Sequence, residues 1–367
     1  MPPTEIEVYA LPAERFVAAV DRLFTLGEKI IAPTRAPRGD IFFREVDSRE
    51  QMMLEGFGNS EISPAEHVRP SKEVYFSYQL RPGEPPVMTP PPAPEPFVIF
   101  GIRPCDVSAI FALDHFFLER NPRDDLYARR RRAATLIALA CTEPASEACF
   151  CPCCEGGGPV AEEGFDVQLT RVGDWYIVEI ASEKGERIRD LWKSLLEPAT
   201  EEMLEQRAEQ EEQCIEQMFS KNANIGAAVR RVSAGKVEPG TWDEIAEHCY
   251  SCGACSFICP VCTCFDVNDV DMGDKQGMRV RQVDSCRTFG YPREAAGGVR
   301  GFPTAARARM YANHKLSYDH YRERGRYGCV GCGRCVVACL GHMGMPTIAR
   351  LVRKGPTAKQ EGQETQA

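Results

Sequence analysis

The chain has 367 residues, a formal net charge of −9, an ordinary hydrophobic fraction of 43% and 18 cysteines. An acidic balance argues against a nucleic-acid surface, and a chain of this length does not need disulfides in place of a hydrophobic core. We find no secretory signal at the N-terminus and no apolar run of membrane-spanning length. We therefore expect a cytoplasmic protein whose reduced thiols bind metal.

The N-terminal segment predicts short helices and strands. Apolar residues at helical spacing predict an amphipathic helix over 16–24, which Gly27 would end. The short apolar runs KIIA (29–32) and DIFF (40–43) predict strands. The proline-rich run over 81–96 predicts an extended surface loop or linker.

A βαβ unit is predicted next. FVIFGI (97–102) and ATLIALAC (134–141) are typical of buried parallel strands, and the residues from Asp106 predict a helix with Asp106 as its N-cap. Parallel strands end at the same edge of a sheet, where open α/β sheets place their ligands. Because Cys105 and Cys141 follow the two strands closely, we expect both thiols at this edge.

Four more cysteines follow within CFCPCCEGGGP, at residues 149–159. We infer a [4Fe–4S] cluster at this N-terminal site, held by Cys105, Cys141, Cys149 and Cys151. No standard ligand spacing is matched here, so other ligands stay open, namely Cys153, Cys154 and Asp106. A zinc site and a group of packed free thiols are the two alternative interpretations of these cysteines.

The middle of the chain predicts a hairpin and a polar helix. Residues 165–181 alternate between apolar and polar side chains, with Gly173 and Asp174 at the turn of a β-hairpin. Residues 197–219 predict an acidic helix with a solvated face. Cys214 on this helix has no cysteine nearby in sequence, and we interpret it as inert.

The bacterial ferredoxin spacing C-x2-C-x2-C-x3-C occurs twice, from Cys249 to Cys259 and from Cys329 to Cys339. Three thiolates of each motif hold one [4Fe–4S] cubane, and the fourth ligates the other cluster. A pair of zinc sites would not need this spacing. The first cluster is therefore predicted to use Cys249, Cys252, Cys255 and Cys339. The second is predicted to use Cys329, Cys332, Cys335 and Cys259.

Three cysteines near the first motif are not used by this assignment: Cys262, Cys264 and Cys286. They are either packed, inert thiols or partial ligands of another metal, and we favour packing. Between the two motifs, helical spacing of aromatic residues predicts a helix from Pro303 to Gly325. Residues after Lys354 are expected to be disordered.

Together these elements predict an α+β protein. An N-terminal α/β domain with a mixed sheet would occupy residues 1–196, and an acidic helical connector would occupy 197–240. A C-terminal α-helical, ferredoxin-like dicluster domain would occupy 241–353, and a disordered tail would occupy 354–367.

The order of the motifs resembles a known family. GIRPCD (101–106), CFC followed by GGGP, CPVCTCFDV (259–267), DSC at 284–286, the HK of YANHKLSY and CVGCGRC (329–335) follow one another. This set is similar to that of the iron–sulfur electron-transfer subunits of anaerobic sulfite reductases and to that of the β subunits of soluble nickel–iron sulfhydrogenases, over about residues 97–345. The resemblance implies two ferredoxin-type clusters and an additional N-terminal one, and it matches Cys105, Cys141, Cys149 and Cys151 to family positions. The chain departs from the family pattern at Cys153, Cys154 and Leu340.

By this resemblance, the chain is an electron-transfer component of a multisubunit anaerobic oxidoreductase. It would relay single electrons between a partner that binds flavin and NAD(P)H and a catalytic partner with a sirohaem or nickel–iron centre. We find no short dinucleotide, P-loop, zinc-protease or nucleophile-elbow motif in the sequence. Two other functions stay open: an enzyme with an open iron at the N-terminal cluster, and a scaffold whose clusters only hold shape.

Overall fold

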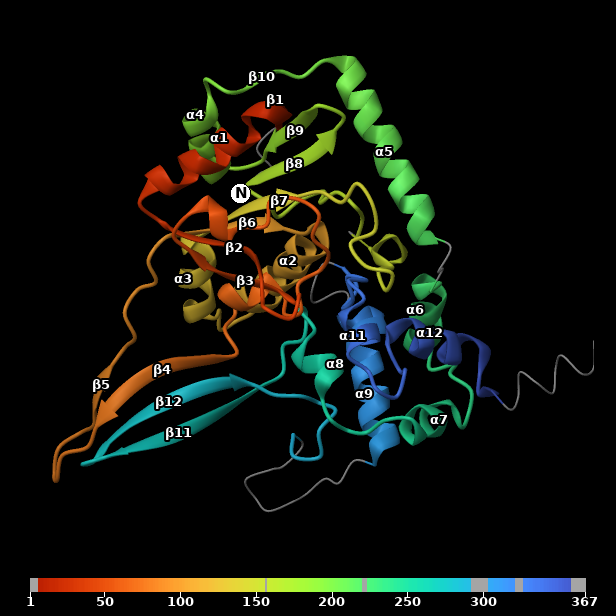
Figure 1. Cartoon of the computed structure of the whole chain (residues 1–367). Coiled ribbons are helices and arrows are strands. Elements are labelled where there is room, and N and C mark those ends of the chain that lie inside the picture. The colour runs from red at the N-terminus through yellow and green to blue at the C-terminus, as the bar shows by residue number, and fades with distance from the viewer. Residues whose placement is uncertain (1–5, 156, 220–222, 292–302, 321–325, 358–367) are drawn as a thin grey trace, which may run out of the picture.

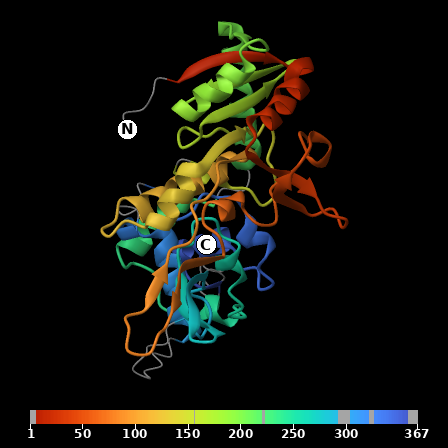
Figure 2. The same ribbon diagram turned by 90° about the vertical axis from the view of Figure 1, so that its left-hand side faces the viewer.

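The computed structural model describes residues 6–155, 157–219, 223–291, 303–320 and 326–357. A large sheet with its helices lies at one end of the molecule, and the short helices around the ferredoxin motifs lie at the other (Figure 1; Figure 2). Within the described ranges, no helix has the length and apolar character needed to cross a membrane.

The large sheet has eight strands in the order β10–β1–β9–β8–β7–β6–β2–β3. Neighbours are parallel from β2 through β6 and β7 to β8, and antiparallel elsewhere. Its strands are β1 (Glu7–Pro12), β2 (Lys29–Arg35), β3 (Ile41–Val46), β6 (Phe97–Ile102), β7 (Ala134–Leu139), β8 (Val167–Val172), β9 (Trp175–Ile180) and β10 (Glu197–Pro198). The expected mixed sheet is confirmed, and so are the parallel pair β6–β7 and the hairpin of β8 and β9.

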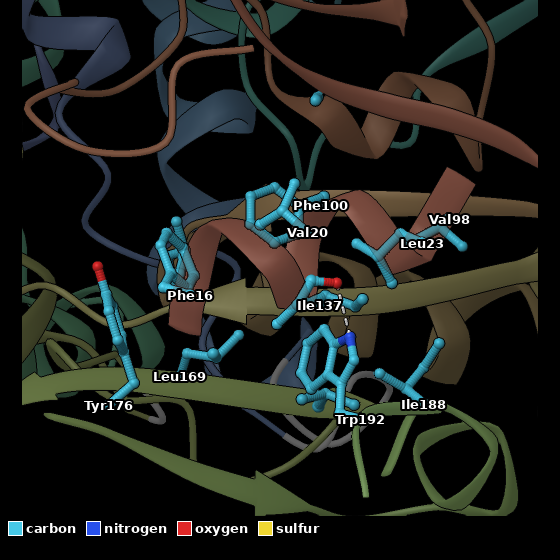
Figure 3. Close-up of a cluster of buried hydrophobic side chains, with 14 of the residues drawn as sticks. Phe16, Val20, Leu23, Val98, Phe100, Ile137, Leu169, Tyr176, Ile188 and Trp192 are labelled. Atoms are coloured by element: carbon cyan, nitrogen blue, oxygen red, sulfur yellow. Dashed lines mark hydrogen bonds between the residues drawn. The ribbon is translucent and has the colours of Figure 1, made fainter. Parts of the chain in front are cut away.

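Helices cover both faces of this sheet. One face packs against α1 (Ala13–Leu23) and α4 (Glu183–Trp192), and the other packs against α2 (Pro104–Leu118) and α3 (Asp125–Ala133). Successive residues of a strand point to opposite faces of the sheet. Adjacent residues of β6 therefore pack into two different hydrophobic cores, one on each face. Figure 3 shows the α1 and α4 face, where the indole nitrogen of Trp192 donates to the Ala19 carbonyl at 2.8 Å. The sheet is therefore a firmly packed support for the loops at its edge.

The start of α2 differs from the prediction. The helix begins at Pro104, with Arg103 as its N-cap, so the interpretation of Asp106 as the cap is wrong. Proline favours the first helical position because its φ is preset and its missing N–H is not needed there. Asp106 instead lies inside the first turn, completely buried, where its two carboxylate oxygens accept from Arg334 at 2.7 and 2.9 Å.

A second sheet joins the two halves of the chain. It has the order β11–β12–β4–β5, with β4 (Lys72–Gln79), β5 (Val87–Thr89), β11 (Phe265–Gly273) and β12 (Gln276–Val283). It extends away from the large sheet in Figure 1. The expectation of a mostly helical segment over 241–353 misses the hairpin of β11 and β12, whose mostly exposed first strand carries little apolar signal. Strand β5 likewise lies within the predicted proline-rich linker, and all three of its residues are exposed.

Helix α5 (Glu201–Phe219) packs against the large sheet and the N-terminal cysteine loop. The remaining helices lie around the C-terminal cysteines: α6 (Ile225–Ser233), α7 (Thr241–Glu247), α8 (Ala254–Phe257), α9 (Thr304–Leu316), α11 (Arg334–Val337) and α12 (Met345–Lys354). Helix α9 starts directly after Pro303, as predicted, but it ends at Leu316. The predicted end at Gly325 lies outside the described residues, as does most of the tail predicted to be disordered over 354–367. Of that tail, Lys354 ends α12 and the Thr357 amide donates to the Glu244 carboxylate at 2.7 Å. Short 3₁₀ helices lie at Phe24–Leu26, Arg49–Gln51, Pro64–His67 and Cys151–Cys153.

Candidate metal centre

Both ferredoxin motifs have the same local backbone. A glycine in the left-handed region, Gly253 (φ 79°) or Gly333 (φ 80°), precedes a four-residue helix, α8 or α11. A β-carbon at Gly333 would lie 2.4 Å from the Ala148 carbonyl oxygen, so both the conformation and the space require glycine there. The last cysteine of each motif follows the end of its helix, so each motif presents three cysteines around the helix and one beyond it.

The second motif forms a cavity together with one cysteine of the first motif. Four cysteines line this cavity: Cys259, Cys329, Cys332 and Cys335. Phe150, Tyr311 and Met345 complete much of its apolar wall. Burial raises the pKa of the Cys332 thiol to about 12, because a nearly dry site disfavours the charged thiolate. This is the donor set that crossed ligation requires for the second cluster.

The cysteines of the first motif lie beside the last cysteine of the second. Cys255 is close enough to interact electrostatically with Cys249 and Cys339, and burial and these neighbours raise its pKa to about 11. Cys252 is the exposed member of the first motif. The structure thus places Cys339 near the cysteines of the first motif, with which the ferredoxin spacing predicts that it shares a cluster.

Each of these two groups has one buried cation on a sulfur. Arg287 donates to the Cys249 sulfur at 2.8 Å, and Lys315 donates to the Cys259 sulfur at 3.1 Å. Both side chains are 3% exposed. Within the described part of the chain, the buried Nε and Nη1 of Arg287 have no hydrogen-bond partner. A buried cation with spare donors beside thiolates fits an anionic iron–sulfur cluster, whose sulfides accept hydrogen bonds.

The N-terminal cysteines gather at the expected edge of the large sheet. Cys149 and Cys151 are buried next to Cys141, which follows β7. Cys105, in the first turn of α2, is packed mainly against Cys332 and Val330 of the second ferredoxin motif. Asn59 lies between the two groups, with its side-chain nitrogen 3.4 Å from the Cys149 sulfur and its oxygen 4.0 Å from the Cys105 sulfur. Cys105 therefore lies between the N-terminal site and the second motif.

Cys214 belongs to this N-terminal group, and the sequence interpretation missed it. Its side chain is completely buried and packs with Cys149, Cys151 and Met218. It lies on α5, which runs from the large sheet toward the C-terminal helices (Figure 1). The one sequence signal was the pair Cys214 and Met218, four residues apart and so on one face of an otherwise acidic helix.

The N-terminal cysteine loop touches the second ferredoxin motif directly. The Phe150 amide donates to the Gly331 carbonyl at 2.9 Å. A β-carbon on Gly331 would lie 2.4 Å from the Cys151 α-carbon, so glycine is needed for this approach. The Asp106 carboxylate, considered as a ligand from the sequence, is held here by Arg334 and Ser63 instead.

The other cysteines lie beside the predicted ligands. Cys154 lies next to Cys329, and Cys262 lies next to Cys259. Cys264 contacts Cys286, His314 and Tyr291, and these hydrogen bonds lower the pKa of Cys264 to about 4. Cys153 is half-buried and packs against the hydrophobic cluster that contains Cys154 and Cys264.

Residues 248–343, which contain both cysteine motifs, match the family model of the 4Fe-4S dicluster domain, so this part of the chain is an iron–sulfur domain. The chain is, more particularly, a homologue of a protein named "Sulfhydrogenase 2 subunit beta" from Pyrococcus furiosus. The two are 29% identical over 352 residues, which cover 94% of this chain and 98% of the relative. This similarity agrees with the family resemblance of the motifs and extends it to nearly the whole length.

Proposed function

We propose that this chain is an electron-transfer subunit that relays single electrons through three [4Fe–4S] clusters. The observation that carries the proposal is the cavity lined by Cys329, Cys332 and Cys335 together with Cys259 of the other motif. Two motifs that exchange a ligand hold their clusters close together, which suits electron transfer and is not needed for a purely structural site.

The proposed ligands follow from the spacing and from the contacts. The first cluster uses Cys249, Cys252, Cys255 and Cys339, and the second uses Cys259, Cys329, Cys332 and Cys335. A third cluster at the N-terminal site uses Cys141, Cys149 and Cys151, with Cys105 as the preferred fourth ligand and Cys214 as its competitor. The contact between Phe150 and Gly331 supports an electron path from the third cluster to the second.

The homologue's name supports a role within a larger assembly. We infer a cytoplasmic, anaerobic, multisubunit oxidoreductase in which this chain exchanges electrons with a flavin- and NAD(P)H-binding subunit. A catalytic subunit with a nickel–iron or sirohaem centre would stand at the other end of the path. When bound, the clusters supply the one-electron chemistry, while the chain sets their spacing, their burial and the hydrogen bonds to their sulfurs.

Metal and sulfide analysis of anaerobically purified full-length protein tests the proposal. We expect about twelve irons per chain with an equal amount of acid-labile sulfide, and reversible reduction in a potentiometric titration. About eight irons would contradict the third cluster. Iron that cannot be reduced reversibly at any accessible potential would contradict the electron-transfer function itself.

The fourth ligand of the third cluster can be decided by comparing Cys105→Ser with Cys214→Ser. The replacement of a true ligand should remove up to about four irons per chain, because the cubane loses one of its four protein thiolates. We expect this loss for Cys105→Ser and near-normal iron content for Cys214→Ser. The reverse pattern would assign the ligand to α5, and iron loss in Cys153→Ser alone would assign it to the half-buried cysteine of the loop itself.

Replacement of Lys315 by methionine should make the reduction potential of the second cluster more negative. The buried ammonium group stabilises the extra negative charge of the reduced state through its 3.1 Å contact with the Cys259 sulfur. A hydrogen bond to a charged group is worth about 1.5–3 kcal/mol, which corresponds to roughly 60–130 mV for one electron. Potentiometric titration followed by electron paramagnetic resonance measures the shift. Lys236→Met removes an exposed lysine and should leave the potentials unchanged.

A further inference from the structure

A second kind of metal-binding group lies outside the proposed cluster ligands. Cys264, Cys286 and His314 place their ligand atoms within 4.8 Å of one another. Cys286 is 1% exposed and Cys264 is 9% exposed, so this group lies largely out of solvent. Two cysteines and one histidine are a donor set that zinc binds in proteins.

Three distant parts of the chain bring these side chains together. Cys264 directly precedes β11, Cys286 follows β12, and His314 lies on α9. The Asp284 amide donates to the Cys264 carbonyl at 3.1 Å, which holds the two ends of the hairpin side by side. The guanidinium of Arg307, on α9, donates to the Arg287 carbonyl at 3.0 Å and fixes the helix against the residue next to Cys286. Backbone contacts therefore position the three side chains.

The distances between these three ligand atoms fit an ion with tetrahedral coordination. Zinc–sulfur bonds of about 2.3 Å and zinc–nitrogen bonds of about 2.0–2.1 Å put tetrahedral ligand atoms roughly 3.5–4 Å apart. A spread within 4.8 Å needs only small side-chain rotations to reach that geometry. The Tyr291 hydroxyl lies near the Cys264 thiol, and the phenol or a water would supply the fourth ligand. Two thiolates would balance the charge of the ion.

We propose that Cys264, Cys286 and His314 bind one Zn²⁺ ion that ties the base of the β11–β12 hairpin to α9. Packing as inert thiols, as favoured from the sequence, accounts for the two cysteines but not for an imidazole aimed at both. The site also adjoins the electron path, because Arg287, which follows Cys286, donates to the Cys249 sulfur. The bound ion would hold that guanidinium in place. The proposal does not depend on electron transfer through the clusters.

Zinc and iron are measured together on the anaerobically purified full-length chain. We expect about one zinc per chain in addition to the iron, with a zinc-edge X-ray absorption spectrum that shows two sulfur ligands near 2.3 Å and nitrogen or oxygen near 2.0–2.1 Å. This spectrum is read on the unaltered protein, so it decides the question even where a variant fails to fold. Absence of zinc, or a zinc bound by four sulfurs, would overturn the proposal.

Variants locate the ion. Cys264→Ser and Cys286→Ser should each lower the zinc content at least tenfold and leave most of the iron, whereas His248→Ala, an exposed histidine of the same region, should change neither. Zinc that persists in both cysteine variants, or that disappears in Cys149→Ser, would overturn the assignment and place the ion at the N-terminal cysteines. One iron lost in Cys286→Ser, in place of zinc, would overturn the choice of metal. A failure of the electron-transfer proposal would instead appear as iron that cannot be reduced, with the zinc result unchanged.

Discussion

Cys339→Ser is expected to destroy or alter the cluster of the first ferredoxin motif and to leave the cluster beside it in sequence intact. The spacing sends the fourth thiolate of each motif to the other cluster, and Cys339 lies within the electrostatic reach of Cys255. Loss of one of four ligands should remove up to about four irons per chain. Iron analysis together with low-temperature electron paramagnetic resonance of the reduced protein measures the effect.

The two buried cations identify which spectroscopic signal belongs to which cluster. Arg287→Met should shift the potential of the cluster on Cys249, and Lys315→Met should shift that of the cluster on Cys259. Crossed ligation requires that Cys339→Ser remove the signal that responds to Arg287→Met. If each motif instead supplied all four ligands of its own cluster, Cys249 and Cys259 would share the first cluster and both cations would act on it. Cys339→Ser would then remove a signal that responds to neither replacement, and crossed ligation would be wrong.

Arg334→Met is expected to be the most destabilising single change away from the cysteines. The Arg334 side chain is 4% exposed and makes two hydrogen bonds to the completely buried carboxylate of Asp106. Removal of one partner of a buried ion pair leaves an uncompensated charge and costs about 3–5 kcal/mol. Because this pair joins α2 to α11, the loss should also loosen the contact between the N-terminal site and the second ferredoxin motif.

Thermal unfolding of the anaerobic holoprotein, with iron release as a second reading, tests this prediction. The apparent midpoint should fall by roughly 5–10 °C, and iron should be released earlier than in the unaltered protein. Arg171→Met breaks an exposed pair with Glu55 and should change the midpoint little, since surface ion pairs contribute about 0–1 kcal/mol. A double replacement, Asp106→Leu with Arg334→Met, should recover part of the lost stability. Equal midpoints for Arg334→Met and Arg171→Met would contradict the assigned role.

The three cysteine groups differ in the charge of the side chains that donate hydrogen bonds to their sulfurs. Cations lie on sulfurs of the first two cysteine groups, while Asn59, a neutral amide, lies between the N-terminal cysteines and the second motif. A positive neighbour favours the reduced state of a cluster more strongly than a neutral hydrogen bond does. We therefore expect the hydrogen bonds of Arg287 and Lys315 to raise the potentials of the first two clusters, which the same potentiometric titrations measure.

Sequence periodicity and spacing determined the local features. The strands over 97–102 and 134–141 are long, apolar and followed by turn residues, so the parallel pair could be predicted. Alternation across Gly173 predicted the hairpin of β8 and β9. Ferredoxin spacing is a short-range chemical constraint, because one cubane fixes how far apart its thiolates can be along the chain. Two such runs therefore predicted the dicluster domain, and the family match over residues 248–343 confirms it.

Only the tertiary structure decided which distant residues meet. Asp106 and Arg334 are 228 residues apart, and nothing local marks them as partners. Cys214 looked isolated because its cysteine neighbours are on a loop that precedes Cys214 by some sixty residues in sequence. Cys264, Cys286 and His314 converge only after β12 pairs with β11 and α9 packs beside them. Local spacing is set by covalent geometry, whereas these contacts depend on how separately formed elements pack, which a single sequence does not encode in any short pattern.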